Sequence, residues 1–238
     1  MSRTITIAAR ELPAYLLSPG GYVITALFLV ITGFLFSFGG FDQGLTASLR
    51  PTFEVITWVL LFICPAIAMR TFSEEFRSGT YEALMTAPVN ERQVVVGKFF
   101  GAFGFLVVIL LPTAIYAFAL EIYGRPDYGE LLCGYLGVLL AGSAYLAAGI
   151  LASTLTSSQV VAFLLAVFFW MGLTVGTKLL PARLGEDLAQ LVILLDPDIR
   201  LRDFGIGLID TSNIVYFLSL TVVFLVAAVK SLEIRRLR

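Results

Sequence analysis

Residues 70–98 read RTFSEEFRSGTYEALMTAPVNERQVVVGK, and this stretch decides how the rest of the chain is interpreted. It is the one long charged segment in the first two-thirds of an otherwise apolar sequence. Apolar runs at 55–69 and 99–120 flank it. Because these runs approach membrane-spanning length, the charged segment between them is expected to lie in water. Its capping residues and helically spaced apolar side chains indicate an ordered segment that docks onto a partner.

Composition places the chain among membrane proteins. It has 238 residues, of which 58% are hydrophobic and 14% are charged, and its mean hydropathy is +0.92. A soluble domain of this length carries roughly 25% charged residues. The net charge of −1 argues against nucleic acid as a partner. The two cysteines, Cys64 and Cys133, are too far apart along the chain to suggest a bridge and are expected to be buried apolar residues; without histidine they cannot make a zinc site.

Six segments have the length and hydrophobicity of spanning helices, and charged residues occur only at their ends. Open strands cannot satisfy their backbone polar groups in lipid, so an all-α polytopic membrane protein with six transmembrane helices is predicted. The predicted spans are residues 22–38, 53–69, 97–120, 131–155, 160–177 and 214–230.

The distribution of Lys and Arg predicts the orientation. Six spans place both termini on one side, and that side then holds ten of the 16 basic residues. Because basic residues concentrate on the cytoplasmic side, both termini and the 70–98 segment are predicted to be cytoplasmic, in the inner membrane of a bacterium.

Two segments outside the spans have helical patterns. Residues 2–17 carry one apolar stripe that includes Ile5, Leu12 and Leu16, and a break follows at 18–21, which predicts an amphipathic elbow helix on the inner surface rather than a frayed leader. In the external segment 178–213, residues 184–195 are too short to span. They are expected to form a re-entrant or interfacial helix, or a simple lid over the bundle.

The charged segment is predicted to contain two short helices. Thr71-x-x-Glu74 matches a capping box, and Phe72 and Phe76 share a helical face before Gly79 interrupts. Thr80 then caps a second helix with Tyr81, Leu84 and Met85, which Pro88 ends. A further capping box, Asn90-x-x-Gln93, begins the third span. The alternative is a solvated amphipathic hairpin lying on lipid headgroups.

The sequence lacks a phosphate-binding loop and other known catalytic motifs, and it lacks the charged residues of an ion-coupled carrier. The one Gly-Lys pair, Gly97-Lys98, lacks the other residues of a phosphate-binding loop, since Arg92 and Phe99 occupy the positions of the first Gly and of the Ser or Thr. A proton-coupled carrier usually keeps ionisable residues at membrane depth, and the predicted spans have charged residues only at their ends. This counts against a stand-alone channel or carrier. The chain is therefore predicted not to be an enzyme and to need a separate source of energy.

Small residues and prolines mark particular points in the spans. Gly97, Gly101 and Gly104, and a Gly/Ala series from 134 to 152, predict close helix packing, either within the chain or at a dimer seam. Pro65 and Pro112 are expected to kink the second and third spans, and Pro65 is a candidate hinge one turn before the charged segment.

The phrase SEEFRSGTYEALMTAPV at 73–89, followed by VGKF at 96–99, resembles the ABC-2 type transporter permeases, which carry E-E-x-x-x-G-T-x-E-x-L-x-x-x-P-V and a following G-K. AREL at 9–12 and the phrase FGIGLID at 204–210 are also similar to this family. The size of the chain fits the small gliding-motility-type branch best.

The resemblance implies that 71–88 is a cytoplasmic coupling helix between the second and third spans, which inserts into a separate ATP-binding subunit. Two permeases and two ATP-binding subunits would form the transporter, with ATP and Mg²⁺ on the partner and no cofactor on this chain. The candidate docking residues are Phe72, Glu74, Glu75, Phe76, Arg77, Gly79, Thr80, Glu82 and Leu84.

Two functions are compatible with this pattern. One is the export of an unidentified substrate through a dimer of permeases. The other is mechanotransmission, in which ATP-driven motion acts on an external or membrane-anchored accessory protein without a transported substrate. The few polar residues in the spans favour a lipidic substrate or no substrate.

Overall fold

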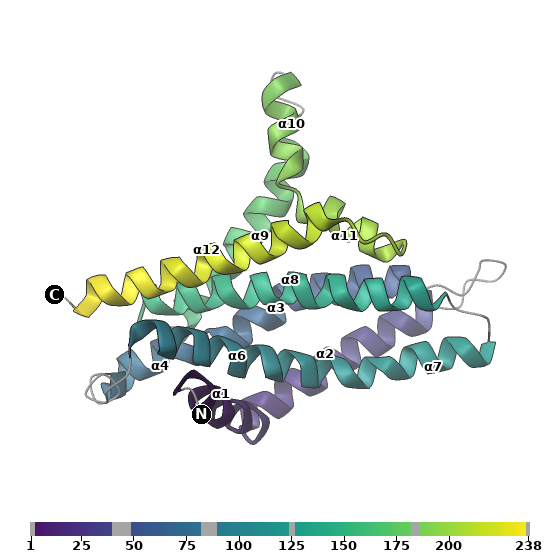
Figure 1. The fold of residues 1–238 in the computed structure, drawn as a ribbon. Coiled ribbons are helices and arrows are strands. Elements are labelled where there is room, and N and C mark those ends of the chain that lie inside the picture. The colour runs from purple at the N-terminus through teal and green to yellow at the C-terminus, as the bar shows by residue number, and fades with distance from the viewer. Residues whose placement is uncertain (1–2, 40–48, 82–89, 124–126, 182–185, 237–238) are drawn as a thin grey trace.

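The computed structural model describes residues 3–39, 49–81, 90–123, 127–181 and 186–236. The regular elements of these residues are helices (Figure 1). No strand occurs in those residues. The elements are α1 (Arg3–Leu16), α2 (Pro19–Gly39), α3 (Arg50–Ala68), α4 (Arg70–Ser78), α6 (Glu91–Leu110), η1 (Leu111–Thr113), α7 (Ala114–Tyr123), α8 (Tyr128–Leu155), α9 (Gln159–Leu179), α10 (Glu186–Leu194), α11 (Pro197–Gly205) and α12 (Thr211–Arg236).

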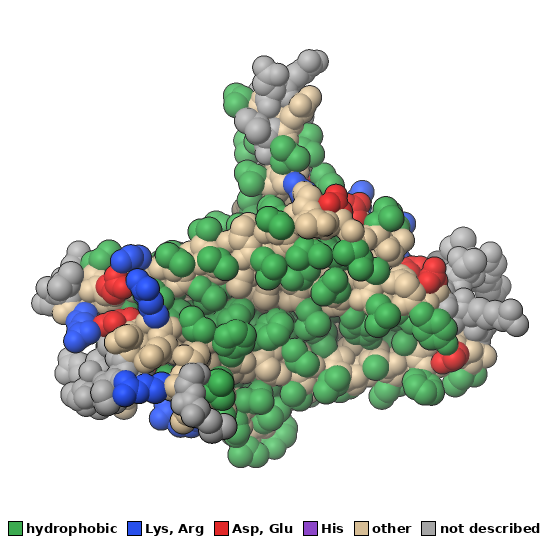
Figure 2. Space-filling model, viewed as in Figure 1, with side chains coloured by type: hydrophobic (Ala, Val, Ile, Leu, Met, Phe, Trp, Pro, Cys, Tyr) green, Lys and Arg blue, Asp and Glu red, His purple; other side chains and the backbone are tan. Residues whose placement is uncertain are grey.

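Six helical stretches among the described residues are long and apolar enough to cross a membrane, which confirms the predicted fold class. Hydrophobic side chains cover the flanks of the bundle, and charged side chains gather mainly toward its ends (Figure 2). We call these ends the α4 end, which also carries the C-terminal part of α12, and the α11 end. The six stretches are Pro19–Ser37, Arg50–Ser78, Glu91–Ile122, Tyr128–Leu155, Gln159–Leu179 and Thr211–Arg236.

Several of these helices extend beyond the predicted spans. The second stretch runs on to Ser78, and the last runs on to Arg236. Hydropathy marks where a helix leaves the apolar part of the membrane, whereas the helix itself continues through charged residues that favour helical geometry. The third stretch is divided by η1 at Pro112, where a break was expected, because proline cannot donate the backbone hydrogen bond of an unbroken helix.

Helix α8 lies at the centre of the bundle and packs against α3, α6, α9, α11 and α12. Its small residues allow these close contacts. A Cβ atom at Gly134 would lie 2.2 Å from the Phe53 ring, and one at Gly149 would lie 2.7 Å from Cβ of Ala68. These positions therefore pack within the chain, which was one of the two alternatives for the small residues.

The turn between α1 and α2 was expected only as a break, and it is also the start of a helix. Oγ of Ser18 accepts a hydrogen bond from the backbone N–H of Gly21 at 2.9 Å. Pro19 occupies the first position of α2, where its missing N–H carries no penalty. Ser18 therefore caps α2, as serine does at many helix N-termini.

The segment between α9 and α12 contains two helices with different positions. Helix α10 projects away from the bundle (Figure 1) rather than lying across it. Whether it is re-entrant or interfacial stays a prediction. Helix α11 packs on α8 and α3 instead. Backbone carbonyls of Leu194 and Leu195 accept hydrogen bonds from Arg200 and Tyr216, which tie the end of α10 to α11 and α12.

The two cysteines are free and buried, as expected. Pro65 lies inside α3, and its Cα would be 3.3 Å from a Cβ placed at Gly149, so it is packed closely against α8. The hinge at Pro65 stays a prediction.

Candidate functional site at the α4 end

Helix α4 continues the second span. Met69, which separates α3 from α4, has helical backbone angles, and its N–H donates to the carbonyl of Pro65 at 2.8 Å. The predicted capping box at Thr71 is therefore wrong, because no new helix begins there. Thr71 is buried, and its hydroxyl oxygen lies 3.2 Å from the Tyr15 hydroxyl of α1.

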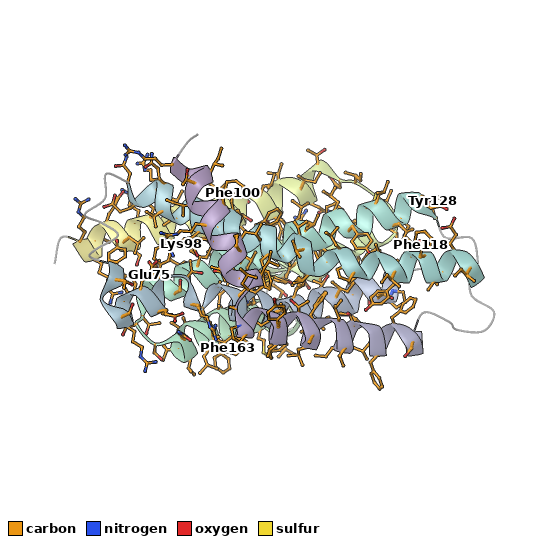
Figure 3. The ribbon with its side chains drawn as sticks, turned by 90° about the horizontal axis from the view of Figure 1, so that it is seen from below. Glu75, Lys98, Phe100, Phe118, Tyr128 and Phe163 are labelled. Atoms are coloured by element: carbon orange, nitrogen blue, oxygen red, sulfur yellow. The ribbon has the colours of Figure 1, made fainter. Side chains whose placement is uncertain are left out.

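A buried lysine joins three elements at this end of the bundle. The side chain of Lys98, on α6, is 3% exposed. Its Nζ atom donates to Oε1 of Glu75 on α4 at 2.7 Å, to Oε1 of Glu11 on α1 at 3.3 Å, and to the carbonyl of Thr71 at 3.0 Å. Figure 3 shows Lys98 and Glu75 close together at one end of the molecule. We call Glu11, Thr71, Glu75 and Lys98 the Lys98 cluster.

Burial makes this cluster a strong constraint on geometry. A charged ammonium removed from water is tolerated only when acceptors replace its hydration shell. The three oxygens come from α1 and α4, so neither helix can move away without leaving the charge poorly solvated. Oε2 of Glu75 is buried and has no hydrogen-bond partner, so the cluster holds this carboxylate through one oxygen.

Three glycines explain how Glu11 reaches Lys98. A Cβ at Gly97 would lie 2.8 Å from Ile7, and one at Gly101 would lie 2.6 Å from Cβ of Glu11. Gly104 faces Leu12 in the same way, at 3.4 Å. The glycine series on α6 is thus the surface on which α1 lies, and it is an intramolecular contact.

Aromatic rings enclose the cluster. Phe72 is fully buried, and Nζ of Lys98 lies 5.3 Å from the centre of its ring, a cation–π distance. Tyr15 stacks on Phe105 with ring centres 5.6 Å apart, and burial raises the pKa of its phenol. The Phe72 ring helps to keep the Lys98 ammonium away from water, and lower exposure strengthens its ion pairs.

The C-terminal part of α12 supports α4 from another side. The guanidinium of Arg235 lies 3.8 Å from the centre of the Phe76 ring and donates to the carbonyl of Thr154 at 3.2 Å. Arg236 pairs with Glu91 at the start of α6 at 2.7 Å. Helix α4 thus packs on α8 and α9, and side chains of α1, α6 and α12 add contacts to it.

The outer part of α4 remains accessible. Glu74, Arg77, Ser78, Gly79 and Thr80 are exposed, and we call them the α4 tip. Gly79 ends the helix with φ of 72°, in the left-handed region that glycine adopts without strain. The interruption expected at Gly79 is thus found.

The structure divides the predicted docking residues into two groups. Glu74, Arg77, Gly79 and Thr80 lie on the exposed tip. Phe72 and Glu75 face inward: Phe72 is part of the core, and Glu75 pairs with Lys98. The docking role of the predicted residues stays a prediction. Phe76 is half-buried against Arg235 and Tyr81.

Two of the predicted residues, Glu82 and Leu84, lie outside the described residues, as does most of the second short helix. The start of the third span is described: the N–H of Asn90 donates to Oε1 of Gln93 at 3.3 Å, as in the expected capping box, and α6 begins at Glu91.

Sequence reasoning missed Lys98 and Glu11 as site residues. A lysine next to glycines at the start of an apolar span was a signal, since a charge there needs partners if the helix is covered. The partners could not be named, because Glu11 lies 87 residues from Lys98 along the chain. The described residues contain no group of His, Cys, Asp and Glu side chains suited to a metal ion.

Comparison with known proteins gives a family for this chain. The model of the ABC-2 family transporter proteins matches residues 48–230. The chain belongs to the ABC-2 transporter family. The match includes α4 and Lys98 but not α1, which supplies Glu11. A comparison with curated proteins gives no match.

Membership of this family identifies the chain as a multi-pass membrane subunit of an ABC transporter. Permeases of this family work with an ATP-binding cassette partner and generally as dimers. At the α4 end of the ABC-2 permease, α4 packs on α8 and α9 and presents an exposed polar tip.

Proposed function

We propose that this ABC-2 permease exports a substrate across a bacterial inner membrane, as a dimer driven by two ATP-binding subunits that dock on the α4 tip. The α4 end would then be cytoplasmic, together with both termini. Size and the phrases at 73–89 and 204–210 favour the gliding-motility-type branch of the family.

The observation that carries this proposal is the rigid connection between the α4 tip and the second span. Helix α4 follows α3 with one intervening residue in helical conformation. A push on the tip therefore acts on α3 directly, and the Lys98 cluster passes the same push to α1 and α6. A solvated hairpin on lipid headgroups would not need a buried lysine to fix its position.

The exposed charges of the tip supply the docking contacts. Glu74 and Arg77 carry opposite charges on neighbouring turns and have no ion-pair partner among the described residues. Charged groups at the edge of an interface set its specificity and association rate. Phe76 supplies an apolar edge beside them.

Charge reversal at the tip tests this assignment. Glu74→Lys combined with Arg77→Glu should reduce co-purification of the ATP-binding subunit by about tenfold, as expected for the loss of two charged contacts. The permease itself should insert and purify normally, because both side chains are exposed at the α4 tip.

The matched control is Glu54→Lys, an exposed carboxylate near the α11 end whose side chain is 59% exposed. This variant should co-purify the ATP-binding subunit like the wild type. Unchanged co-purification of the double variant, or an equal loss in the control, would remove the docking assignment.

A further inference from the structure

The α11 end contains a concave pocket that the proposed docking function does not use. It has a volume of about 140 Å³ and lies between α3, α8, α11 and the last turn of α9. The Phe53 and Phe204 rings form its apolar floor, and they reach α8 because Gly134 and Gly137 leave room for them. Trp58 forms part of the wall and is 43% exposed.

The charges of the pocket are unequal. Its cations are Arg50, Lys178 and Arg202, and its carboxylates are Glu54 and Asp198. Figure 2 shows acidic and basic side chains gathered at the base of α10, where α11 lies.

Two of the cations are paired. Nζ of Lys178 lies 2.5 Å from Oδ2 of Asp198 and 5.6 Å from the centre of the Trp58 ring. Nε of Arg50 lies 3.9 Å from Oε1 of Glu54. The Arg202 guanidinium has no ion-pair partner in the described parts of the chain, so the pocket has one uncompensated positive charge.

We infer that this pocket binds a phosphate-type anion that is attached to an apolar group. A guanidinium offers two parallel N–H donors that match a phosphate oxygen pair. The floor of Phe53 and Phe204 and the Trp58 wall suit apolar atoms next to that phosphate. The volume equals about five water molecules of liquid, which suits a phosphate with a few carbon atoms rather than a whole lipid.

The position of the pocket is consistent with this ligand. It lies beside the first three turns of α3 and the second and third turns of α8, toward the ends of two spans, which is close to the depth of lipid headgroups. Two sources share this chemistry: a phospholipid headgroup with the start of its chains, and a soluble phosphoester. The site is at the opposite end of the molecule from the α4 tip, so its test does not depend on ATPase docking.

Trp58 provides a reporter for binding. The chain has two tryptophans, and the other, Trp170, is fully buried against Tyr145 with ring centres 4.6 Å apart. Trp170→Phe leaves Trp58 as the sole emitter, and the replaced indole N–H has no hydrogen-bond partner to lose.

In the lipid arm, the Trp170→Phe protein is placed in phosphatidylcholine nanodiscs that contain a minor fraction of chain-brominated phosphatidylglycerol. Trp58 should be quenched more strongly than by the same fraction of brominated phosphatidylcholine. In the soluble arm, the protein in detergent is titrated with glycerol phosphate, and a saturable change in Trp58 emission indicates a soluble phosphoester.

In the arm that shows binding, Arg202→Gln should weaken the affinity reported by Trp58 by about tenfold, as expected when a charge-assisted hydrogen bond is lost. Arg202→Lys should lose part of it, because lysine keeps the charge but not the fork of donors. The control is Arg92→Gln, which removes an exposed arginine at the α4 end and should leave the response unchanged.

Several results would overturn the inference. One is that the two brominated lipids quench Trp58 equally and glycerol phosphate gives no saturable response. Another is that Arg202→Gln and Arg92→Gln change the response equally. A response to a short polyglutamate peptide but to neither phosphate source would assign the pocket to an acidic protein partner instead.

Discussion

At the scale of single residues, the stability of the fold should depend strongly on Lys98, because this buried charge is solvated only by its protein neighbours. Lys98→Met would leave Glu75 without its cation in a partly buried space, and Glu11 would keep only the longer contact with Arg10 at 3.7 Å. Breaking a buried ion pair in this way typically costs roughly 3 kcal/mol. We expect a clear loss of thermal stability in detergent, measured by tryptophan fluorescence.

The companion variants decide whether charge is the cause. Glu75→Gln should destabilise more than Glu11→Gln, because Glu75 is the nearer partner at 2.7 Å against 3.3 Å. Lys98→Met combined with Glu11→Gln and Glu75→Gln should recover much of the stability, since no unpaired charge remains. A single Lys98→Met variant as stable as the wild type would contradict the role of the cluster.

At the scale of elements, the contact between α1 and α6 depends on glycine. Gly101→Leu places a side chain where Cβ of Glu11 lies 2.6 Å away, so α1 has to move off α6. Trypsin should then cleave at Arg10 several times faster than in the wild type, because local opening exposes backbone to proteolysis.

Gly172→Leu is the control for this prediction, because Gly172 on α9 has nothing within 4 Å of its Cβ position. Its cleavage rate should match the wild type. If trypsin cleaves the Gly101→Leu variant at Arg10 at the wild-type rate, then α1 is not held by the glycine series on α6.

The elements also show what could be predicted from the sequence. The six spans, the end of α4 at Gly79 and the start of α6 follow from local patterns of hydropathy and capping. The continuity of α3 with α4 did not follow, because Thr71 and Glu74 match a capping box even though they lie inside a helix. Helix α4 packs on α8 and α9, and Glu75 binds Lys98 on α6. These elements are distant from α4 in sequence, so no local pattern could report that Phe72 and Glu75 face inward.

At the scale of the whole molecule, six spans and the distribution of Lys and Arg predict that the α4 end faces the cytoplasm and the α11 end faces outward. Ser78 is exposed at the α4 end and Leu208 is exposed near the α11 end, while Cys64 and Cys133 are buried. A membrane-impermeant maleimide should label Leu208→Cys in spheroplasts, which lack the outer membrane. It should label Ser78→Cys only after the inner membrane is opened. The reverse pattern would invert the proposed orientation.

If force enters this ABC-2 permease through the α4 tip, the ATP-binding subunit must contact that tip, and site-specific photo-crosslinking detects this contact. A photoreactive amino acid at Ser78 is expected to crosslink to the ATP-binding subunit in membranes, while the same group at Leu208 is expected to give no such product. Absence of the crosslink from Ser78, in a complex that still hydrolyses ATP, would contradict the account.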